Sequence, residues 1–192
     1  MADLKIEPAK TALVVIDLQR GIVAMPAVPN SPAEVIGRAA RLAAALRAAG
    51  GTVVFVHVTP SVDGKDGLRP ITDATQAAGR AMPPDWAEFV PELGIAQSDI
   101  IITKRQWGAF YGTELDLQLR RRGVDTILLC GISTNIGVES TARDAFERNY
   151  NQIFVEDAMA ARDPEEHRHT VQTLFPRLGR VRSTAEVIAA IG

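Results

Sequence analysis

Two charged side chains and one turn in this sequence are placed where they can do chemistry. Asp17, Lys104 and the turn over residues 131–137 each come directly after a short run of apolar residues. A carboxylate beside an ammonium group at the mouth of a cleft can transfer protons or hold a charged ligand. Taken alone, Asp17 would be a turn or helix-cap residue and Lys104 a surface charge. Their shared placement favours the functional interpretation.

The turn is the most informative of the three positions. Ser133, Thr134 and Asn135 precede a helical pattern and offer hydroxyl and amide groups as helix caps. The first N–H groups of such a helix are unpaired and partly positive, which favours a ligand site. Gly137, at the tip of the turn, has no side chain and cannot act as a nucleophile.

The elements that must position these groups are strands that alternate with helices. Apolar, β-branched runs predict strands over residues 11–16, 52–58, 99–103, 125–130 and 152–156, with a short edge strand over 179–182. Helical patterns lie over residues 31–50, 113–122, 135–148, 164–175 and 184–191. This order predicts a single α/β domain over residues 1–192, a three-layer doubly wound (Rossmann-like) sandwich with a mainly parallel sheet of about six strands. The carboxyl ends of its strands would meet at one rim.

One long connection interrupts this alternation. Residues 59–98 are rich in Pro, Gly and Asp, and they allow only short helical turns over 72–78 and 86–89. A connection of this length inside a compact domain is usually functional, so we expect a lid or a subunit contact.

Composition excludes several classes of partner. The formal net charge of −2 gives no electrostatic reason to bind nucleic acid or an anionic membrane. No stretch reaches the roughly 18 apolar residues of a membrane-spanning helix. The only cysteine, Cys130, excludes an internal disulfide and follows an apolar run that predicts a buried thiol. We expect a cytoplasmic protein whose partner is a small molecule or another copy of the chain.

Three spaced motifs resemble the isochorismatase-like hydrolase superfamily. They are IDLQ over residues 16–19, Lys104 with GAFYGTEL over 108–115, and GISTNIGVESTARDA over 131–145. Cysteine amidohydrolases of this superfamily, such as nicotinamidases and carbamoylsarcosine amidases, use an Asp, Lys and Cys triad. The resemblance places Asp17 and Lys104 at the first two positions and Gly137 at the third, where isochorismatases proper also carry Gly. It further implies a cis peptide between Ile132 and Ser133.

Without a thiol, covalent amide hydrolysis has no nucleophile. A vinyl ether needs none, because protonation of its terminal carbon creates an oxocarbenium ion that water captures. Asp17 would be the general acid in that reaction. A neutral Asp17 carboxyl is then required near neutral pH, whereas a close Lys104 ammonium favours the carboxylate. Burial of Asp17, or a substrate carboxylate that draws Lys104 away, would reconcile the two demands.

Eight further residues are candidates for substrate binding. They are Gln19, Arg105, Trp107, Phe110, Ser133, Thr134, Asn135 and Ile136. Arg105 could pair with a substrate carboxylate, or it is a solvated loop charge. Trp107, Phe110 and Tyr111 could wall an apolar pocket, with Phe110 nearest the ligand by resemblance, or they pack in the core or against a subunit. Gln19 could orient Asp17 or lie in the turn, and Asn135 could contact ligand or cap its helix.

No metal or cofactor is expected. Metal-binding relatives carry an Asp and two His residues after the second strand, where this chain has only His57 and Asp63. His167 and His169 are two residues apart in a predicted helix, so we expect them to be solvated and on different faces. No nucleotide-binding glycine motif follows the first strand.

Three functions remain open on this sequence. The favoured one is an isochorismatase-like hydrolase of a small carboxylated metabolite, with Asp17 as acid and Lys104 as its charge partner. A catalytically silent metabolite-binding protein is the second, and a cysteine-independent amidase with Asp17 activating water is the third. The resemblance also implies a homo-oligomer, a dimer or tetramer.

Overall fold

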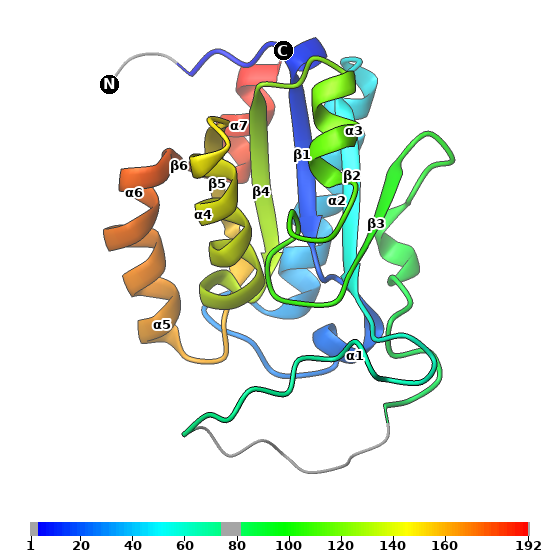
Figure 1. Ribbon diagram of the computed structural model, residues 1–192. Helices are drawn as coiled ribbons and strands as arrows, with labels where there is room; N and C mark the ends of the chain where they lie inside the picture. Colours follow the sequence, from blue (N-terminus) through cyan, green and yellow to red (C-terminus); the bar gives the residue numbers. More distant parts are fainter. Residues whose placement is uncertain (1–3, 74–81, 192) are drawn as a thin grey trace.

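A six-stranded parallel sheet forms the centre of the molecule (Figure 1). The computed structural model describes residues 4–73 and 82–191. Its strands are β1 (Thr11–Ile16), β2 (Thr52–Val58), β3 (Ile100–Lys104), β4 (Thr126–Ile132), β5 (Asn151–Ala160) and β6 (Arg180–Arg182). They lie in the order β3-β2-β1-β4-β5-β6, and every pair is parallel. The predicted fold class is therefore confirmed.

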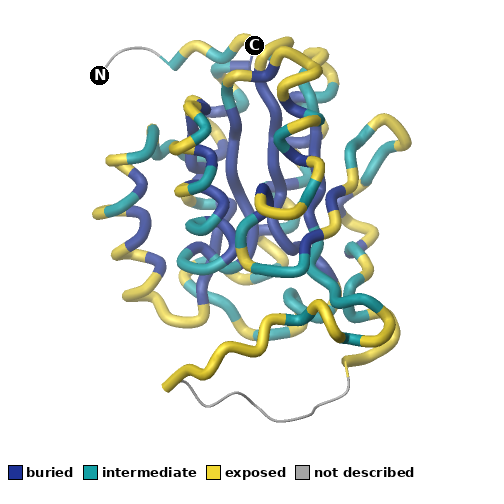
Figure 2. Tube along the Cα trace, viewed as in Figure 1, coloured by how far each residue is buried: buried dark blue, intermediate teal, exposed yellow. Residues whose placement is uncertain are grey.

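Helices cover both faces of this sheet (Figure 1). On one face, α2 (Pro32–Ala48) and α7 (Thr184–Ile191) pack on alternate side chains of β1, among them Leu13. On the other face, α3 (Leu115–Arg121), α4 (Glu139–Glu147) and α6 (Phe175–Leu178) pack on the intervening side chains, among them Val14. The β1 strand is buried along its whole length, as its continuously apolar sequence requires (Figure 2).

The strand order fixes where a ligand can bind. From β1 the chain moves outward through β2 to β3, and it then crosses back to start β4 on the other side of β1. The carboxyl ends of β1 and β4 therefore flank the point where the winding reverses. Open parallel sheets bind their ligands in the crevice at this point.

Strand β5 departs from the prediction, because it is twice as long as expected. Its register against β4 shifts between Leu129 and Gly131, and residues of β5 between Phe154 and Met159 bulge out of the pairing. The strand resumes after the bulge and ends at Ala160. The sequence predicted its end at Glu156, because the Glu-Asp pair there interrupts the apolar run.

Two predicted helices are interrupted. The expected helix over 135–148 begins with a π-helical turn, Thr134–Val138, before α4. The expected helix over 164–175 consists of α5 (Pro164–His169), a π-helical turn over Thr170–Leu174 and then α6. Periodicity alone does not show such insertions, because one extra residue in a turn barely changes the apolar pattern.

Short elements in the connections were also missed or misassigned. The structure adds α1 (Arg20–Val23) and 3₁₀ turns over Pro8–Lys10 and Pro91–Leu93. The short turn expected over 86–89 lies slightly earlier, over residues 84–87, and Phe89 pairs with Gln19 in an antiparallel bridge. Most of the expected turn over 72–78 lies outside the described residues.

Candidate active site

A cavity of about 600 Å³ opens at the carboxyl ends of β1, β3 and β4. It lies at the reversal point of the sheet, and Asp17, Lys104 and Gly137 all line it. The three positions that the sequence singled out therefore meet in one pocket.

Asp17 follows β1, and its backbone has a φ of 54°, in the left-handed region that residues other than glycine rarely adopt. Its backbone N–H donates to the carbonyl of Val56 at 2.9 Å, which holds it against β2. The side chain is buried, and its Oδ2 accepts a hydrogen bond from Lys104 Nζ at 2.8 Å. Its Oδ1 is buried and has no hydrogen-bond partner in the described part of the chain. One carboxyl oxygen is thus uncommitted.

Lys104 is the last residue of β3 and is only 2% exposed. Its ammonium group donates to Asp17 Oδ2 and to the carbonyls of Gln106 (3.1 Å) and Trp107 (2.8 Å). Three bonds use all three protons of the group, so its position is fixed. Lys104 therefore holds Asp17 and the loop after β3 together.

Burial and pairing act in opposite directions on Asp17. Burial raises the pKa of its carboxyl, and the charge and hydrogen bond of Lys104 lower it. Burial has the larger effect, and the resulting pKa is about 6. Asp17 therefore keeps a protonated fraction near neutral pH, which a general acid requires.

Gly137 lies directly against this pair. A Cβ atom on Gly137 would be 3.1 Å from Asp17 Oδ2 and 2.9 Å from Ile16 Cγ2. A side chain here would thus touch the carboxyl group, and glycine leaves that space free.

The turn reaches this position through an unusual backbone. Gly131 has a φ of 123°, and a Cβ there would lie 2.1 Å from the carbonyl oxygen of Ile16, so β4 approaches β1 closely only with glycine. The peptide between Ile132 and Ser133 is cis, at the position where the sequence analysis expects it.

Five of the eight predicted substrate-binding residues line the cavity. They are Arg105, Trp107, Ser133, Asn135 and Ile136. Arg105, however, is already engaged, because its Nε lies 2.8 Å from Asp66 Oδ2 and its Nη1 donates to the carbonyl of Thr59. Arg105 therefore anchors the loop after β2.

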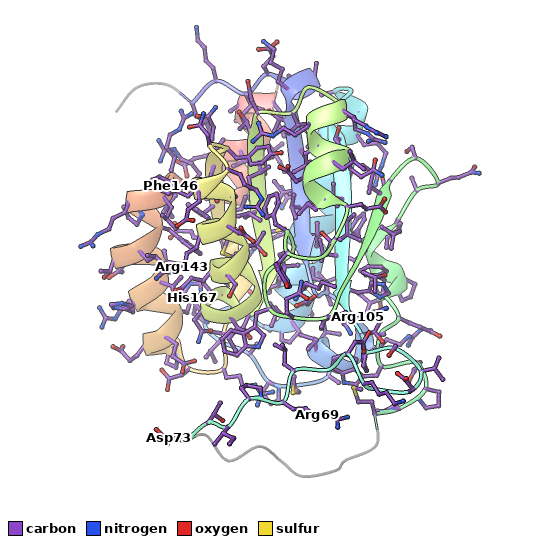
Figure 3. The ribbon with its side chains drawn as sticks, in the orientation of Figure 1. Arg69, Asp73, Arg105, Arg143, Phe146 and His167 are labelled. Atoms are coloured by element: carbon purple, nitrogen blue, oxygen red, sulfur yellow. The ribbon has the colours of Figure 1, made fainter. Side chains whose placement is uncertain are left out.

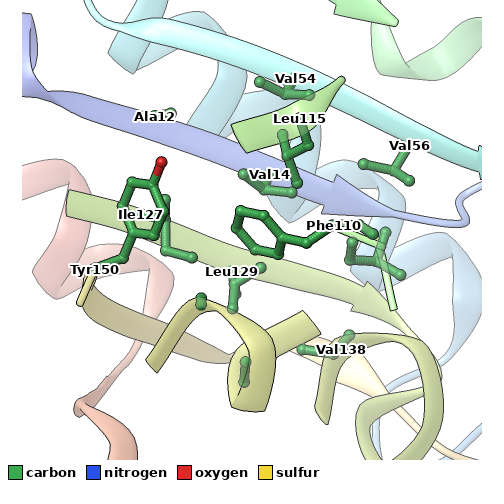
Figure 4. Close-up of a cluster of buried hydrophobic side chains, with 14 of the residues drawn as sticks. Ala12, Val14, Val54, Val56, Phe110, Leu115, Ile127, Leu129, Val138 and Tyr150 are labelled. Carbon is green, nitrogen blue, oxygen red and sulfur yellow. The ribbon is translucent and has the colours of Figure 1, made fainter. Parts of the chain in front are cut away.

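The other three predicted residues lie outside the cavity lining, and their assignment is corrected. Gln19 is fully buried and bridges to Val58, donating to its carbonyl at 3.0 Å and accepting from its N–H at 2.9 Å. Phe110 is a core residue whose ring lies 5.7 Å from that of Tyr150 (Figure 4). Thr134 is fully buried, and its Oγ1 lies 2.8 Å from Nδ1 of His167. Tyr111, 75% exposed, does not line it either.

Arg162 is a cavity residue that the sequence analysis missed. It follows β5, and its guanidinium donates to the sulfur of Met25 at 2.8 Å. No carboxylate lies within 4 Å of it among the described residues. Its position two residues after the end of β5 could have identified it, but the predicted strand ended four residues too early, at Glu156.

His167 is also corrected, because it is buried rather than solvated. Its Nδ1 lies 2.8 Å from Thr134 Oγ1, and burial lowers the pKa of its imidazole from the usual 6.5. Helical spacing cannot show this contact, since the partner lies more than thirty residues earlier in the chain.

The described part of the chain, residues 4–73 and 82–191, offers neither a metal-ligand cluster nor a membrane-spanning helix. This part contains no group of three or more His, Cys, Asp or Glu side chains arranged to hold a metal ion. His57 is engaged with the carbonyl of Ala87 and the hydroxyl of Thr103. None of the described helices combines the length and apolarity needed to cross a membrane.

Comparison with known proteins identifies the family. The isochorismatase domain matches residues 11–186 of this chain. The chain belongs to the isochorismatase family. It is 52% identical to the isochorismatase family protein YwoC of Bacillus subtilis strain 168 over 100% of this chain and 99% of that protein.

Two further relatives are similar over nearly the whole chain. The structure of an isochorismatase family protein from Burkholderia thailandensis superposes with a TM-score of 0.94 at 45% identity, covering 99% of both chains. The ureidoacrylate amidohydrolase RutB of Methylobacterium radiotolerans is 30% identical over 98% of this chain and 82% of its own length. Members of the family are hydrolases, and this protein is an isochorismatase-family hydrolase.

Proposed function

We propose that this hydrolase cleaves the vinyl ether of a small carboxylated metabolite, and that isochorismate is its substrate. The products would be pyruvate and a dihydroxycyclohexadiene carboxylate. The observation that carries the proposal is the buried Asp17 carboxyl, with its pKa raised to about 6, facing a glycine where a nucleophile would stand.

In the proposed mechanism Asp17 donates its proton to the terminal carbon of the vinyl group. The C=C electron pair forms the new C–H bond, and the adjacent carbon becomes an oxocarbenium ion. Water adds to this carbon, and the resulting hemiketal expels the alcohol to leave pyruvate. A proton released in these steps restores Asp17, and Lys104 keeps the carboxyl in place throughout.

Arg162 is the residue that we assign to a substrate carboxylate, in place of Arg105. Its guanidinium has no acidic partner among the described residues, whereas that of Arg105 is paired with Asp66. A guanidinium fork matches a carboxylate in geometry and charge.

The amidase alternative takes its support from the amidohydrolase relative. A thiol mechanism is disfavoured, because the only cysteine, Cys130, is fully buried in β4 and burial raises the pKa of its thiol to about 12. Activation of water by Asp17 remains as the amidase route. A catalytically silent binding protein is the second alternative, which the same pocket would serve.

We place the enzyme, as one domain, in the cytoplasm.

The test is a product assay on the purified wild-type protein. We expect pyruvate release from isochorismate and no ammonia release from ureido acids or simple amides. Ammonia without pyruvate would replace the proposal with the amidase. Neither product, together with saturable isochorismate binding in calorimetry, would replace it with the binding protein.

A further inference from the structure

The turn between β4 and α4 determines what Asp17 faces. Gly137 lies in the π-helical part of this turn, against Asp17 Oδ2, and Ser133, Asn135 and Ile136 line the cavity beside it. A small movement of the turn would therefore open or close the space around the carboxyl group. Whatever fixes the turn also fixes the surroundings of Asp17.

Thr134 is a buried residue of the turn that attaches it to the α5 segment. It is completely buried, and its Oγ1 lies 2.8 Å from Nδ1 of His167, which is itself 8% exposed. Neither side chain lines the cavity. If this buried hydroxyl and imidazole moved apart, no water would replace the lost hydrogen bond, and both groups would be left without a partner. That cost holds the pair in one geometry.

Two other hydrogen bonds join the same two segments, one from the turn and one from outside it. Asn135 Nδ2 donates to Glu166 Oε2 at 3.0 Å, and just past the turn Thr170 Oγ1 donates to Glu139 Oε2 at 2.9 Å. Figure 3 labels His167 on the α5 segment beside α4. Both segments contain a π-helical turn, a local widening that recurs at functional sites.

We propose that His167 is a positioning residue, which through Thr134 holds the turn over Thr134–Val138 against Asp17 and so keeps the Asp17 carboxyl buried. The effect of this role on turnover rests on the proposed function, whereas its effect on the burial of Asp17 does not. His167 touches neither the cavity nor the reacting groups, and it acts only through the turn.

The proposal predicts the titration of Asp17 in a set of variants, observed through the ¹³C signal of its carboxyl group. In wild type we expect a pKa of about 6. Thr134→Val and His167→Phe each remove the hydrogen bond, so the turn loosens, water reaches Asp17, and its pKa falls toward the usual value near 4. Thr134→Ser keeps the hydroxyl and should titrate like wild type.

Thr170→Val is the matched control on the same helical segment. It removes the bond to Glu139, whose carboxylate keeps Arg143 as a partner at 3.0 Å. This variant should leave the pKa of Asp17 unchanged. Wild-type titration in Thr134→Val would overturn the proposal, and so would a shift of equal size in Thr170→Val. The Thr134→Val and Thr134→Ser pair decides the matter even where His167→Phe fails to fold.

Turnover gives the second readout. Thr134→Val should lower kcat for pyruvate release by about 10- to 100-fold with little change in KM, because a misplaced reacting group affects the chemical step. The double variant with His167→Phe should lose no more than the single variant, since both remove one bond. If wild type releases no pyruvate, the proposed function fails, but the titration still tests the positioning role.

Discussion

Asp17 derives its chemistry from a competition between burial and an ion pair. Lys104 lies 2.8 Å away and favours the carboxylate, but the enclosing β1, β4 and turn residues remove water, and burial prevails. The sequence analysis predicted that both charges lie at one rim, and that burial and Lys104 act in opposite directions on the pKa of Asp17. It could not resolve the conflict, because the balance depends on how closely the turn covers Asp17. The uncommitted Oδ1 oxygen depends on the same three-dimensional detail.

Gly137→Ala tests whether the space beside Asp17 must stay empty. The added Cβ would meet Ile16 Cγ2 at 2.9 Å and Asp17 Oδ2 at 3.1 Å, so we expect a loss of activity and a lower free energy of unfolding by roughly 1–3 kcal/mol. Gly37→Ala is the control, because nothing lies within 4 Å of its added Cβ and alanine favours α2. Urea unfolding measures the stability of both variants, and a turnover assay measures their activity. Wild-type stability and activity in Gly137→Ala would contradict the account.

Arg162→Gln tests the assignment of the carboxylate-binding residue. Loss of a charged hydrogen bond costs about 1.5–3 kcal/mol, which corresponds to a rise in KM of about 10- to 100-fold with little effect on kcat. Arg168→Gln is the matched control on the neighbouring helix, because Arg168 pairs with Glu165 and lies outside the cavity lining. An unchanged KM in Arg162→Gln would refute the assignment.

Among the elements, those with a clear pattern were predictable and those set by tertiary contacts were not. The run over Thr11–Ile16 has the bounds of β1, and the Ser, Pro and Gly signals marked α2. The far end of β5 depends on its register shift against β4, which local sequence does not encode. Arg162 was missed for this reason, since it follows that end. The burial of His167 was missed because its partner, Thr134, lies 33 residues earlier in the chain.

Ser31→Ala tests the helix cap that was plainest in the sequence analysis. Ser31 accepts from the N–H of Glu34, and the Glu34 carboxylate accepts from the N–H of Ser31, which completes a capping box for α2. We expect the alanine variant to lose about 1 kcal/mol in the free energy of unfolding. Ser31→Asn, which retains a cap, should lose much less. Equal stability of all three proteins would show that the cap contributes nothing.

At the scale of the whole molecule, the winding of the sheet brings distant segments to one pocket. Asp17, Lys104, Gly137 and Arg162 follow or end four different strands and meet only because the order reverses beside β1. The alternation of strands and helices predicted a parallel sheet with its carboxyl ends at one rim, so the edge that carries the site was predictable. The strand order itself came from the structure. The residues that complete its walls required the structure.

The exposed aromatic side chains near the cavity support the expected homo-oligomer. Trp107 is 60% exposed and Tyr111 75% exposed, in the loop that follows β3. Contiguous exposed apolar patches mark contacts between proteins, and we propose that these two side chains, four residues apart in one loop, belong to such a contact. We predict a mass by light scattering of about two or four times 20.7 kDa, and a lower mass for Tyr111→Glu. A wild-type mass of 20.7 kDa would contradict the prediction.

The pH dependence of pyruvate release from isochorismate by wild type and Asp17→Asn tests the central claim most directly. The acid form of Asp17 must be the active one, so kcat/KM of wild type should be constant at low pH and fall about tenfold per unit above the pKa. That fall should begin near pH 6, and the folded Asp17→Asn protein should release no pyruvate. Wild-type turnover by Asp17→Asn, or a rate that rises with pH through 6, would contradict general acid catalysis by Asp17.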